Sequence, residues 1–161
     1  MTYTADVFGG NVELRGVSAK AKTAIDTITV TVSGLVELTE GGNVDTVGVL
    51  AAHPDNHWGT TGMVNSLISL ADSLHDTYSL KLRVNDISLP LGGKFDLNAD
   101  YSSGGDHAEH RDGTNADVDV SGLSAAQLDF VRKKWEALST LPAADAVHDE
   151  TKTRNHFHFR Y

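Results

Sequence analysis

The C-terminal segment, residues 155–161, places strict demands on any fold that this chain can adopt. It reads NHFHFRY, and in a β-strand successive side chains point to opposite faces. His156 and His158 therefore share one face, with their Cα atoms about 6.6 Å apart. Phe157 and Phe159 occupy the other face, where they can enter a hydrophobic core. Two adjacent imidazoles suit a site in which one histidine binds a metal and the other transfers protons.

A second polar segment, residues 106–120, reads DHAEHRDGTNADVDV and carries further side chains suited to chemistry. His110 and Asp117 are seven residues apart, and an odd separation places side chains on opposite faces of one straight strand. They can converge only if the chain bends between them, and the Asp-Gly pair at 112–113 is a strong turn signal. We therefore expect a loop histidine, an aspartate at a strand start and a histidine of the C-terminal strand to meet.

The residue types restrict the chemistry of such a site. The chain has no cysteine, so a metal must be held by nitrogen and oxygen atoms. Two histidines and one carboxylate are a common catalytic zinc set, which leaves the fourth tetrahedral position open for water. Zinc lowers the pKa of that water to about 7, and a nearby histidine can accept or deliver the proton. The pattern predicts one Zn2+ per chain, although manganese, cobalt and iron accept the same ligands.

Hydrophobic periodicity predicts an α+β fold with a central, mainly antiparallel sheet and two main helices. Residues 26–33 and 116–120 alternate as half-buried strands, and residues 78–89 also have strand character. Residues 61–74 carry apolar side chains at helical spacing, and one of two threonines at their start can cap the helix.

The second predicted helix, residues 125–138, has the best start signal in the chain. Ser124 and Gln127 form an S-x-x-Q capping box, in which each side chain can bond the backbone N–H of the other residue. The helix is expected to bury Val131 and Trp135, along with two leucines.

The N-terminal region is rich in strand residues and turn glycines. About 45 residues are too few for an independent β-sandwich. The region either completes a sheet of the main domain or is the tail of a larger β module. We therefore divide the chain into a β-rich N-terminal extension, residues 1–48, and a main domain, residues 49–161.

Charge and hydropathy exclude several classes of function. The 161 residues include 13 Lys and Arg against 22 Asp and Glu, which gives a net charge of −9. Because a negative chain repels phosphate groups, binding of nucleic acid or anionic lipid is not expected to be its main role. It has no apolar run of 18 residues that would span a membrane, and no signal peptide is recognisable.

The motifs together resemble a zinc-peptidase superfamily, whose shared pattern is H-x6-D followed far downstream by H-x-H. It contains lysostaphin-type endopeptidases, D-alanyl-D-alanine metallopeptidases, penicillin-insensitive murein endopeptidases and the hedgehog signalling domain. Residues 107–113 (HAEHRDG) resemble the H-x-x-H-x-x-G stretch of the murein endopeptidases, and residues 155–160 (NHFHFR) resemble their N-H-F-H-V-R ending. Residues 84–95 also resemble the strand and Gly-Gly turn expected there, so the resemblance covers the chain from about residue 84 onward.

The resemblance implies a role for each residue of the site and makes residues 49–161 a zinc peptidase-like domain. His110, Asp117 and His158 would bind the zinc, and His156 would be the catalytic histidine. His107 would line the substrate cleft.

The chain departs from the patterns of this superfamily at two positions. The murein endopeptidases carry a further histidine three residues before their H-x-H, where this chain has Thr153. The D-alanyl-D-alanine peptidases carry a glutamate three residues before the last ligand, where it has Asn155. The identity of the general base is therefore open.

Other polar side chains have simpler interpretations. Arg111 can contact a carboxylate of the substrate, although a surface ion pair is the favoured interpretation for this arginine on its own. His148 and Glu150 are expected in a solvated loop, and His53 and His57 are expected to be structural loop residues.

The function implied by the resemblance is zinc-dependent hydrolysis of D-Ala-containing stem or cross-link peptides of bacterial peptidoglycan. Such a substrate places the protein in the extracellular space or the periplasm. The alternative is a non-enzymatic extracellular binding or adhesion module, because the hedgehog domain keeps a zinc site in an interaction role. The choice between endopeptidase and carboxypeptidase action, and the oligomeric state, are not decided by the sequence.

Overall fold

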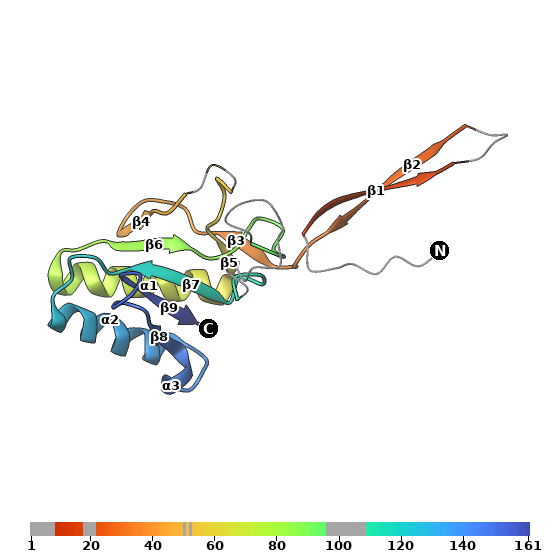
Figure 1. Cartoon of the computed structure of the whole chain (residues 1–161). Coiled ribbons are helices and arrows are strands. Elements are labelled where there is room, and N and C mark those ends of the chain that lie inside the picture. Colours follow the sequence, from red (N-terminus) through yellow and green to blue (C-terminus); the bar gives the residue numbers. More distant parts are fainter. Residues whose placement is uncertain (1–8, 18–21, 50, 52, 96–108) are drawn as a thin grey trace.

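The computed structural model describes residues 9–17, 22–49, 51, 53–95 and 109–161. Its centre is a five-stranded sheet with the order β4-β6-β7-β9-β8 (Figure 1). These strands are β4 (Val44–Thr46), β6 (Leu82–Asp86), β7 (Asn115–Asp119), β9 (His156–Arg160) and β8 (Val147–Asp149). β4 pairs in parallel with β6, and the remaining neighbours in this sheet are antiparallel. The predicted α+β class and mainly antiparallel central sheet are confirmed.

The first main helix, α1 (Thr61–Tyr78), packs its apolar side against the central sheet. Thr60 caps its start, because the side-chain oxygen accepts a hydrogen bond of 3.2 Å from the backbone N–H of Met63. The helix runs past residue 74, its predicted end, and stops at Ser79, whose left-handed backbone (φ 56°) closes it. This longer helix also shortens the predicted 78–89 strand to β6.

The second main helix, α2 (Ala125–Leu138), has the predicted bounds and begins with the predicted capping box. The Ser124 side chain accepts a hydrogen bond from the backbone N–H of Gln127, and the Gln127 side chain accepts one from the backbone N–H of Ser124. A short helix, α3 (Ala143–Ala146), follows. In the part of the chain that the structure describes, no helix combines the length and apolar character needed to cross a membrane.

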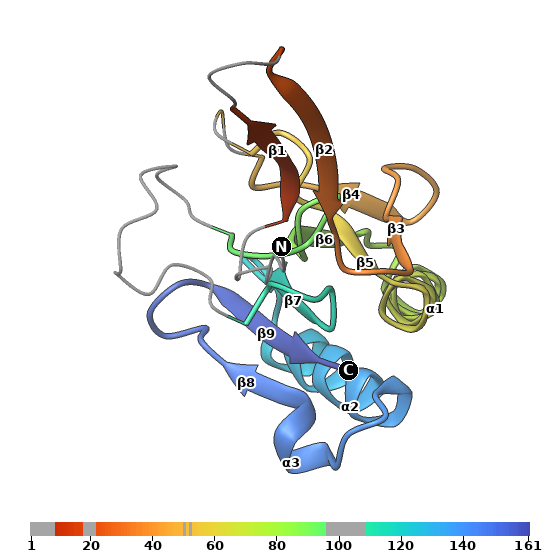
Figure 2. The same cartoon turned by 90° about the vertical axis from the view of Figure 1, so that its right-hand side faces the viewer.

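Both main helices cover the same face of the sheet (Figures 1 and 2). Paired residues on neighbouring strands share a face, and Val84, Val118 and Phe157 are aligned in this way across three strands. All three are fully buried in the hydrophobic core. Phe159 stacks on Trp135 of α2, with ring centroids 4.5 Å apart. The phenylalanine face of β9 is therefore the core face, as its alternation predicts.

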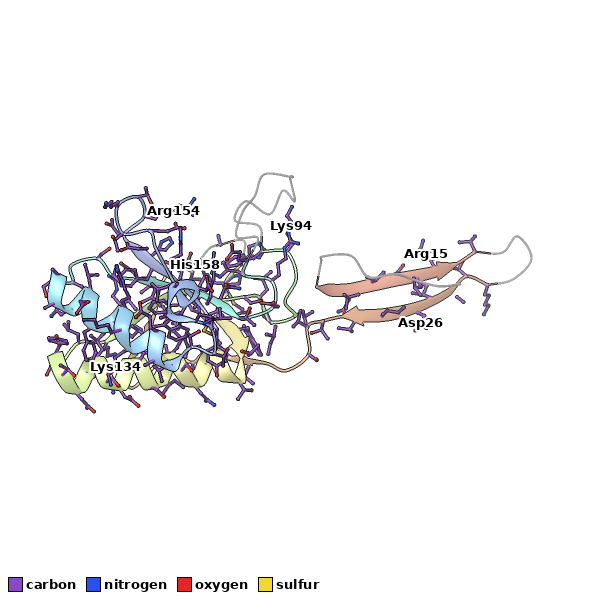
Figure 3. The ribbon with its side chains drawn as sticks, turned by 90° about the horizontal axis from the view of Figure 1, so that it is seen from below. Arg15, Asp26, Lys94, Lys134, Arg154 and His158 are labelled. Atoms are coloured by element: carbon purple, nitrogen blue, oxygen red, sulfur yellow. The ribbon has the colours of Figure 1, made fainter. Side chains whose placement is uncertain are left out.

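Two small antiparallel sheets precede and flank the central one. β1 (Gly10–Gly16) and β2 (Ala24–Val30) form a hairpin that projects from the rest of the molecule, with Arg15 and Asp26 far from His158 (Figure 3). β2 begins and ends earlier than the predicted 26–33 strand.

β3 (Leu35–Glu37) pairs with β5 (Trp58–Thr60), a short strand that the periodicity does not predict. Leu38 and Val44 are buried in the hydrophobic core. Residues 35–46 therefore pack with the central sheet and the helices.

Candidate metal centre

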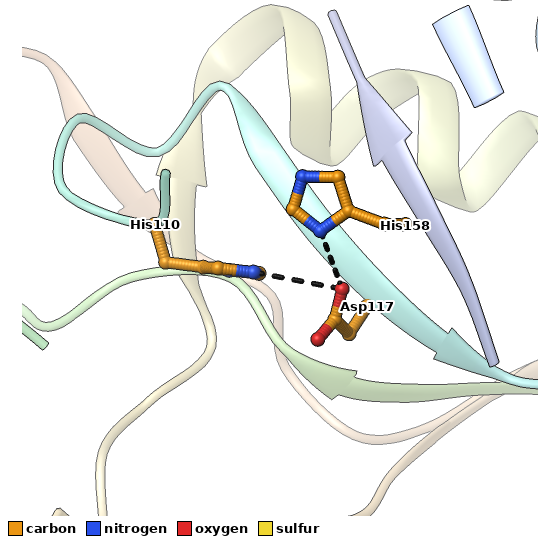
Figure 4. Close-up of side chains that lie close together, drawn as sticks. All are labelled: His110, Asp117 and His158. Atoms are coloured by element: carbon orange, nitrogen blue, oxygen red, sulfur yellow. Dashed lines mark hydrogen bonds and ion pairs between the residues drawn. The ribbon is translucent and has the colours of Figure 1, made fainter. Parts of the chain in front are cut away.

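The chain turns between His110 and Asp117, as the Asp-Gly pair predicts. The carboxylate of Asp112 accepts hydrogen bonds from the backbone N–H of Thr114 (3.0 Å) and from its hydroxyl (2.6 Å). Gly113 has a left-handed backbone, with φ 73°. The turn returns the chain to β7 and allows His110 to approach the same side of the sheet as Asp117 (Figure 4).

Replacing Gly113 by alanine should destabilise this turn. The new Cβ would lie 2.9 Å from the Cα of Gly59 and 3.0 Å from the backbone N of Thr60. The positive φ alone costs about 1 kcal/mol, and the close contacts add about 1–3 kcal/mol. Gly122→Ala is the matched control, because Gly122 also has a positive φ (82°) but open space around it. Thermal unfolding should show a loss of Tm at least twice as large for Gly113→Ala, and equal losses would contradict the close packing.

The register of β7 and β9 places Asp117 directly opposite His158. The two residues share the face of the sheet that points away from the helices, because their neighbours Val118 and Phe157 occupy the core face. On the other side of β7, Asp86 of β6 is aligned with Asp117. The side chains of the predicted ligands therefore meet at the middle of the sheet.

The predicted ligands His110, Asp117 and His158 converge on a common point. His158 Nδ1 lies 2.7 Å from Asp117 Oδ1, and His110 Nε2 lies 3.5 Å from the same oxygen (Figure 4). One donor atom from each residue lies within 4.8 Å of the others. All three residues are buried, with exposed fractions of 2%, 2% and 8%. These residues form a group that could hold a metal ion.

The spacing of the donor atoms can be compared with that of a tetrahedral site. Ligands about 2.0–2.2 Å from a zinc ion lie roughly 3.4 Å from one another. The 3.5 Å separation between His110 and Asp117 meets this requirement. The 2.7 Å contact between His158 and Asp117 is a hydrogen bond, and it would lengthen by about 0.7 Å if a metal replaced the shared proton. The donor set fits a small divalent cation after a minor adjustment.

The ring of His110 is held by the backbone on its far side. Its Nδ1 lies 2.7 Å from the carbonyl oxygen of Ile87, so the N–H at Nδ1 donates to that oxygen. Asp86 Oδ1 lies 3.3 Å from the same nitrogen. Because Nδ1 is bound to the Ile87 carbonyl, Nε2 is the nitrogen that faces Asp117 and the one that would bind a metal.

In His158 the two ring nitrogens have exchanged roles relative to His110. Its Nε2 donates to Glu109 Oε2 at 3.1 Å, while its Nδ1 faces Asp117. Arg160 donates to both oxygens of Glu109, at 2.9 Å from Nε and 3.1 Å from a terminal nitrogen. Sequence analysis misses Glu109, because its partners His158 and Arg160 lie 49 and 51 residues farther along the chain.

Electrostatics favour ionised carboxylates in the site. Burial alone would raise the pKa of Asp117, but hydrogen bonds from His110 and His158 hold it far below its usual value. Burial also opposes the charged form of His158, yet the hydrogen bond and charge of Asp117 raise its pKa. Burial alone would raise the pKa of Glu109, but the charges and hydrogen bonds of Arg160 and His158 together hold it below its usual value. Asp117 is therefore ionised at neutral pH and attracts a cation.

His156 lies beside the three candidate ligands, on the same face of β9 as His158. Its Nε2 is 3.4 Å from Asp117 Oδ2 and 3.3 Å from Glu150 Oε2. Glu150 is therefore part of the site, which differs from the expected solvated loop. Its side chain is only 25% exposed, and Arg154 lies 3.6 Å from it. His148 is exposed, as expected.

The remaining predicted residues are not brought to the ligands by any described contact. His107 lies outside the described residues. Arg111 is half-buried, and its Nε has no hydrogen-bond partner among the described residues. His57 Nε2 contacts the carbonyl oxygens of Val47 and Val84 at 3.1 and 3.0 Å, which is the expected structural role.

No known protein-family model matches this chain, and no curated protein matches it. The fold and the site nevertheless define a class of protein: an α+β domain with a buried His-Asp-His group that could hold a metal ion.

Proposed function

We propose that this chain is a zinc-dependent peptidase of the superfamily that its motifs resemble, acting on the peptide part of bacterial peptidoglycan. One observation carries the proposal: two imidazole nitrogens and one carboxylate oxygen converge, with a further histidine beside them. This donor set leaves one tetrahedral position for water or substrate, as in catalytic zinc sites. A structural zinc site would fill all four positions with protein ligands.

Zinc bound there would polarise a peptide carbonyl and bring the pKa of a water molecule to about 7. His110 and His158 would act as neutral ligands, each with its second nitrogen donating to the protein. Asp117 would supply one negative charge and lower the net charge of the site. These three residues would fix the position of the reacting groups.

His156 is the proposed proton carrier. Its Nε2 lies 3.4 Å from a carboxylate oxygen of Asp117 and 3.3 Å from one of Glu150, so both carboxylates are placed to accept a hydrogen bond from the ring. The imidazole can therefore take the proton that water loses on attack and deliver it to the departing amine. Glu150 would hold the ring in place through the same contact.

The choice of substrate rests on the resemblance of residues 107–113 and 155–160 to the murein endopeptidases. It implies stem or cross-link peptides that contain D-Ala, and an extracellular or periplasmic location. The products would distinguish the two modes of action, since an endopeptidase separates cross-linked fragments and a carboxypeptidase releases a terminal residue.

Chelation and reloading test the proposal directly. The protein should contain one zinc per chain and release peptide fragments from purified peptidoglycan. A chelator should abolish the release, and added zinc should restore it, because the metal is required for attack. Linear dipeptides of L-residues serve as the control substrate. A protein that holds zinc but hydrolyses neither substrate at any pH would instead be the non-enzymatic binding module.

A further inference from the structure

The ring of His158 is clamped between two carboxylates, one at each nitrogen. Nδ1 faces Asp117 Oδ1 at 2.7 Å, and Nε2 faces Glu109 Oε2 at 3.1 Å. A neutral imidazole can bind a metal through either nitrogen, and the hydrogen bond made by the other nitrogen decides which one. Asp117 belongs to the metal group, whereas Glu109 lies outside it.

Glu109 is itself fixed in place. The guanidinium of Arg160 donates to both carboxylate oxygens, which is the planar two-bond geometry that arginine favours. The backbone carbonyl of Arg160 accepts hydrogen bonds from the indole N–H of Trp135 (3.1 Å) and the hydroxyl of Ser139 (2.8 Å). The end of β9, from which the Arg160 side chain reaches Glu109, is thereby tied to α2 and its C-cap.

We propose that Glu109, held by Arg160, is a positioning residue that makes His158 bind the metal through Nδ1. It accepts the N–H of Nε2, keeps the proton on that nitrogen and directs the Nδ1 lone pair toward the metal. This inference rests on the proposed metal centre and adds to it a residue that touches no metal. Outer hydrogen-bond partners of this kind typically change metal affinity by about 10–100-fold.

Glu109 would favour metal binding mainly by orienting the ring of His158, and less by its own negative charge. Arg160 lies within hydrogen-bond distance of both its oxygens, and its positive charge opposes that of the carboxylate. The shorter contact of the corresponding His110 nitrogen is with the backbone carbonyl of Ile87, at 2.7 Å, which would remain if the more distant Asp86 carboxylate, at 3.3 Å, were substituted. Glu109 is therefore the partner through which this kind of control can be measured.

Zinc affinity, measured by competition with a chromogenic chelator, tests the role of Glu109. Glu109→Ala should weaken zinc binding by about 10–100-fold. Glu109→Gln should weaken it less, because the amide oxygen still accepts the N–H of Nε2. Glu13→Ala is the matched control, since it removes a Glu–Arg pair on the distant hairpin and should leave the affinity unchanged. Equal affinity of Glu109→Ala and the wild type would overturn the proposal.

Nitrogen-15 NMR of the zinc-loaded protein shows which ring nitrogen of His158 binds the metal. A purely structural role of Glu109 predicts nothing about this choice. The wild type should show His158 coordinated through Nδ1 and protonated at Nε2, and Glu109→Gln should keep this form. Coordination through Nε2 in the wild type would overturn the inference while leaving the metal centre intact. A wild type that binds no zinc would instead contradict the proposed function, so the two failures are distinguishable.

If Glu109→Ala does not fold, the zinc affinities of Glu109→Gln and Arg160→Lys are compared with that of the wild type instead. Unchanged affinity in both variants would again overturn the inference.

Discussion

Asp117→Ala should abolish stable zinc binding and, with it, hydrolysis. Asp117 is the residue on which both imidazoles converge, and it supplies the only carboxylate of the His-Asp-His group. Its loss leaves two neutral ligands in a buried site, which is too few to hold zinc against water. We expect the affinity to fall by more than the roughly 10–100-fold typical of losing an outer partner. Elemental analysis after dialysis measures the effect.

Asp119→Ala is the matched control for this variant. Asp119 lies two residues along the same strand and pairs with Arg83 at 2.7 Å, outside the candidate ligand group. It should keep a full complement of zinc. If Asp117→Ala does not fold, Asp117→Asn replaces it in the test, since it preserves the shape of the side chain and still removes the charge. Wild-type zinc content in Asp117→Ala would exclude this carboxylate as a ligand.

The second large effect is expected for His156→Ala, which should separate catalysis from metal binding. The imidazole is the proposed proton carrier, and loss of such a group costs about 10²–10⁴-fold in rate. Zinc content should stay at the wild-type level, because His156 is outside the group that could hold the metal. Steady-state kinetics with a soluble wall peptide should show the loss mainly in kcat.

His148→Ala provides the comparison for His156→Ala. His148 lies 3.8 Å from the same glutamate, Glu150, but its side chain is 61% exposed. It should retain wild-type activity. Simultaneous loss of zinc and activity in His156→Ala would make His156 a ligand, and full activity would remove it from the mechanism.

Local signals in the sequence predicted the elements that local interactions control. The start of α2 follows from Ser124 and Gln127, whose mutual hydrogen bonds span three residues. The end of α1 was not predictable from periodicity, because it depends on the backbone conformation of Ser79. β5 was missed for a related reason: three residues carry no periodicity, and pairing with β3 creates the strand.

The candidate ligands could be predicted because their chemistry is unusual and their motifs occur in a specific order. The groups that orient them could not. The partner of His110 is a backbone carbonyl at Ile87, which leaves no trace in the sequence. The partner of His158 is Glu109, which is 49 residues away and lies outside β7, so no local pattern connects the two. Glu150 could not be placed in the site from the sequence, because no spacing rule connects it with His156.

β9 has one face in the hydrophobic core and the other in the metal group, and this limits how the protein can evolve. Phe157 and Phe159 are fully buried, and the two histidines between and beside them are nearly so. In a close-packed interior, a change of volume on one face of a strand displaces the side chains on the other. Variation that would be neutral in an ordinary core strand therefore alters the chemistry here, so descendants of this protein can diverge widely elsewhere while this short stretch stays nearly fixed.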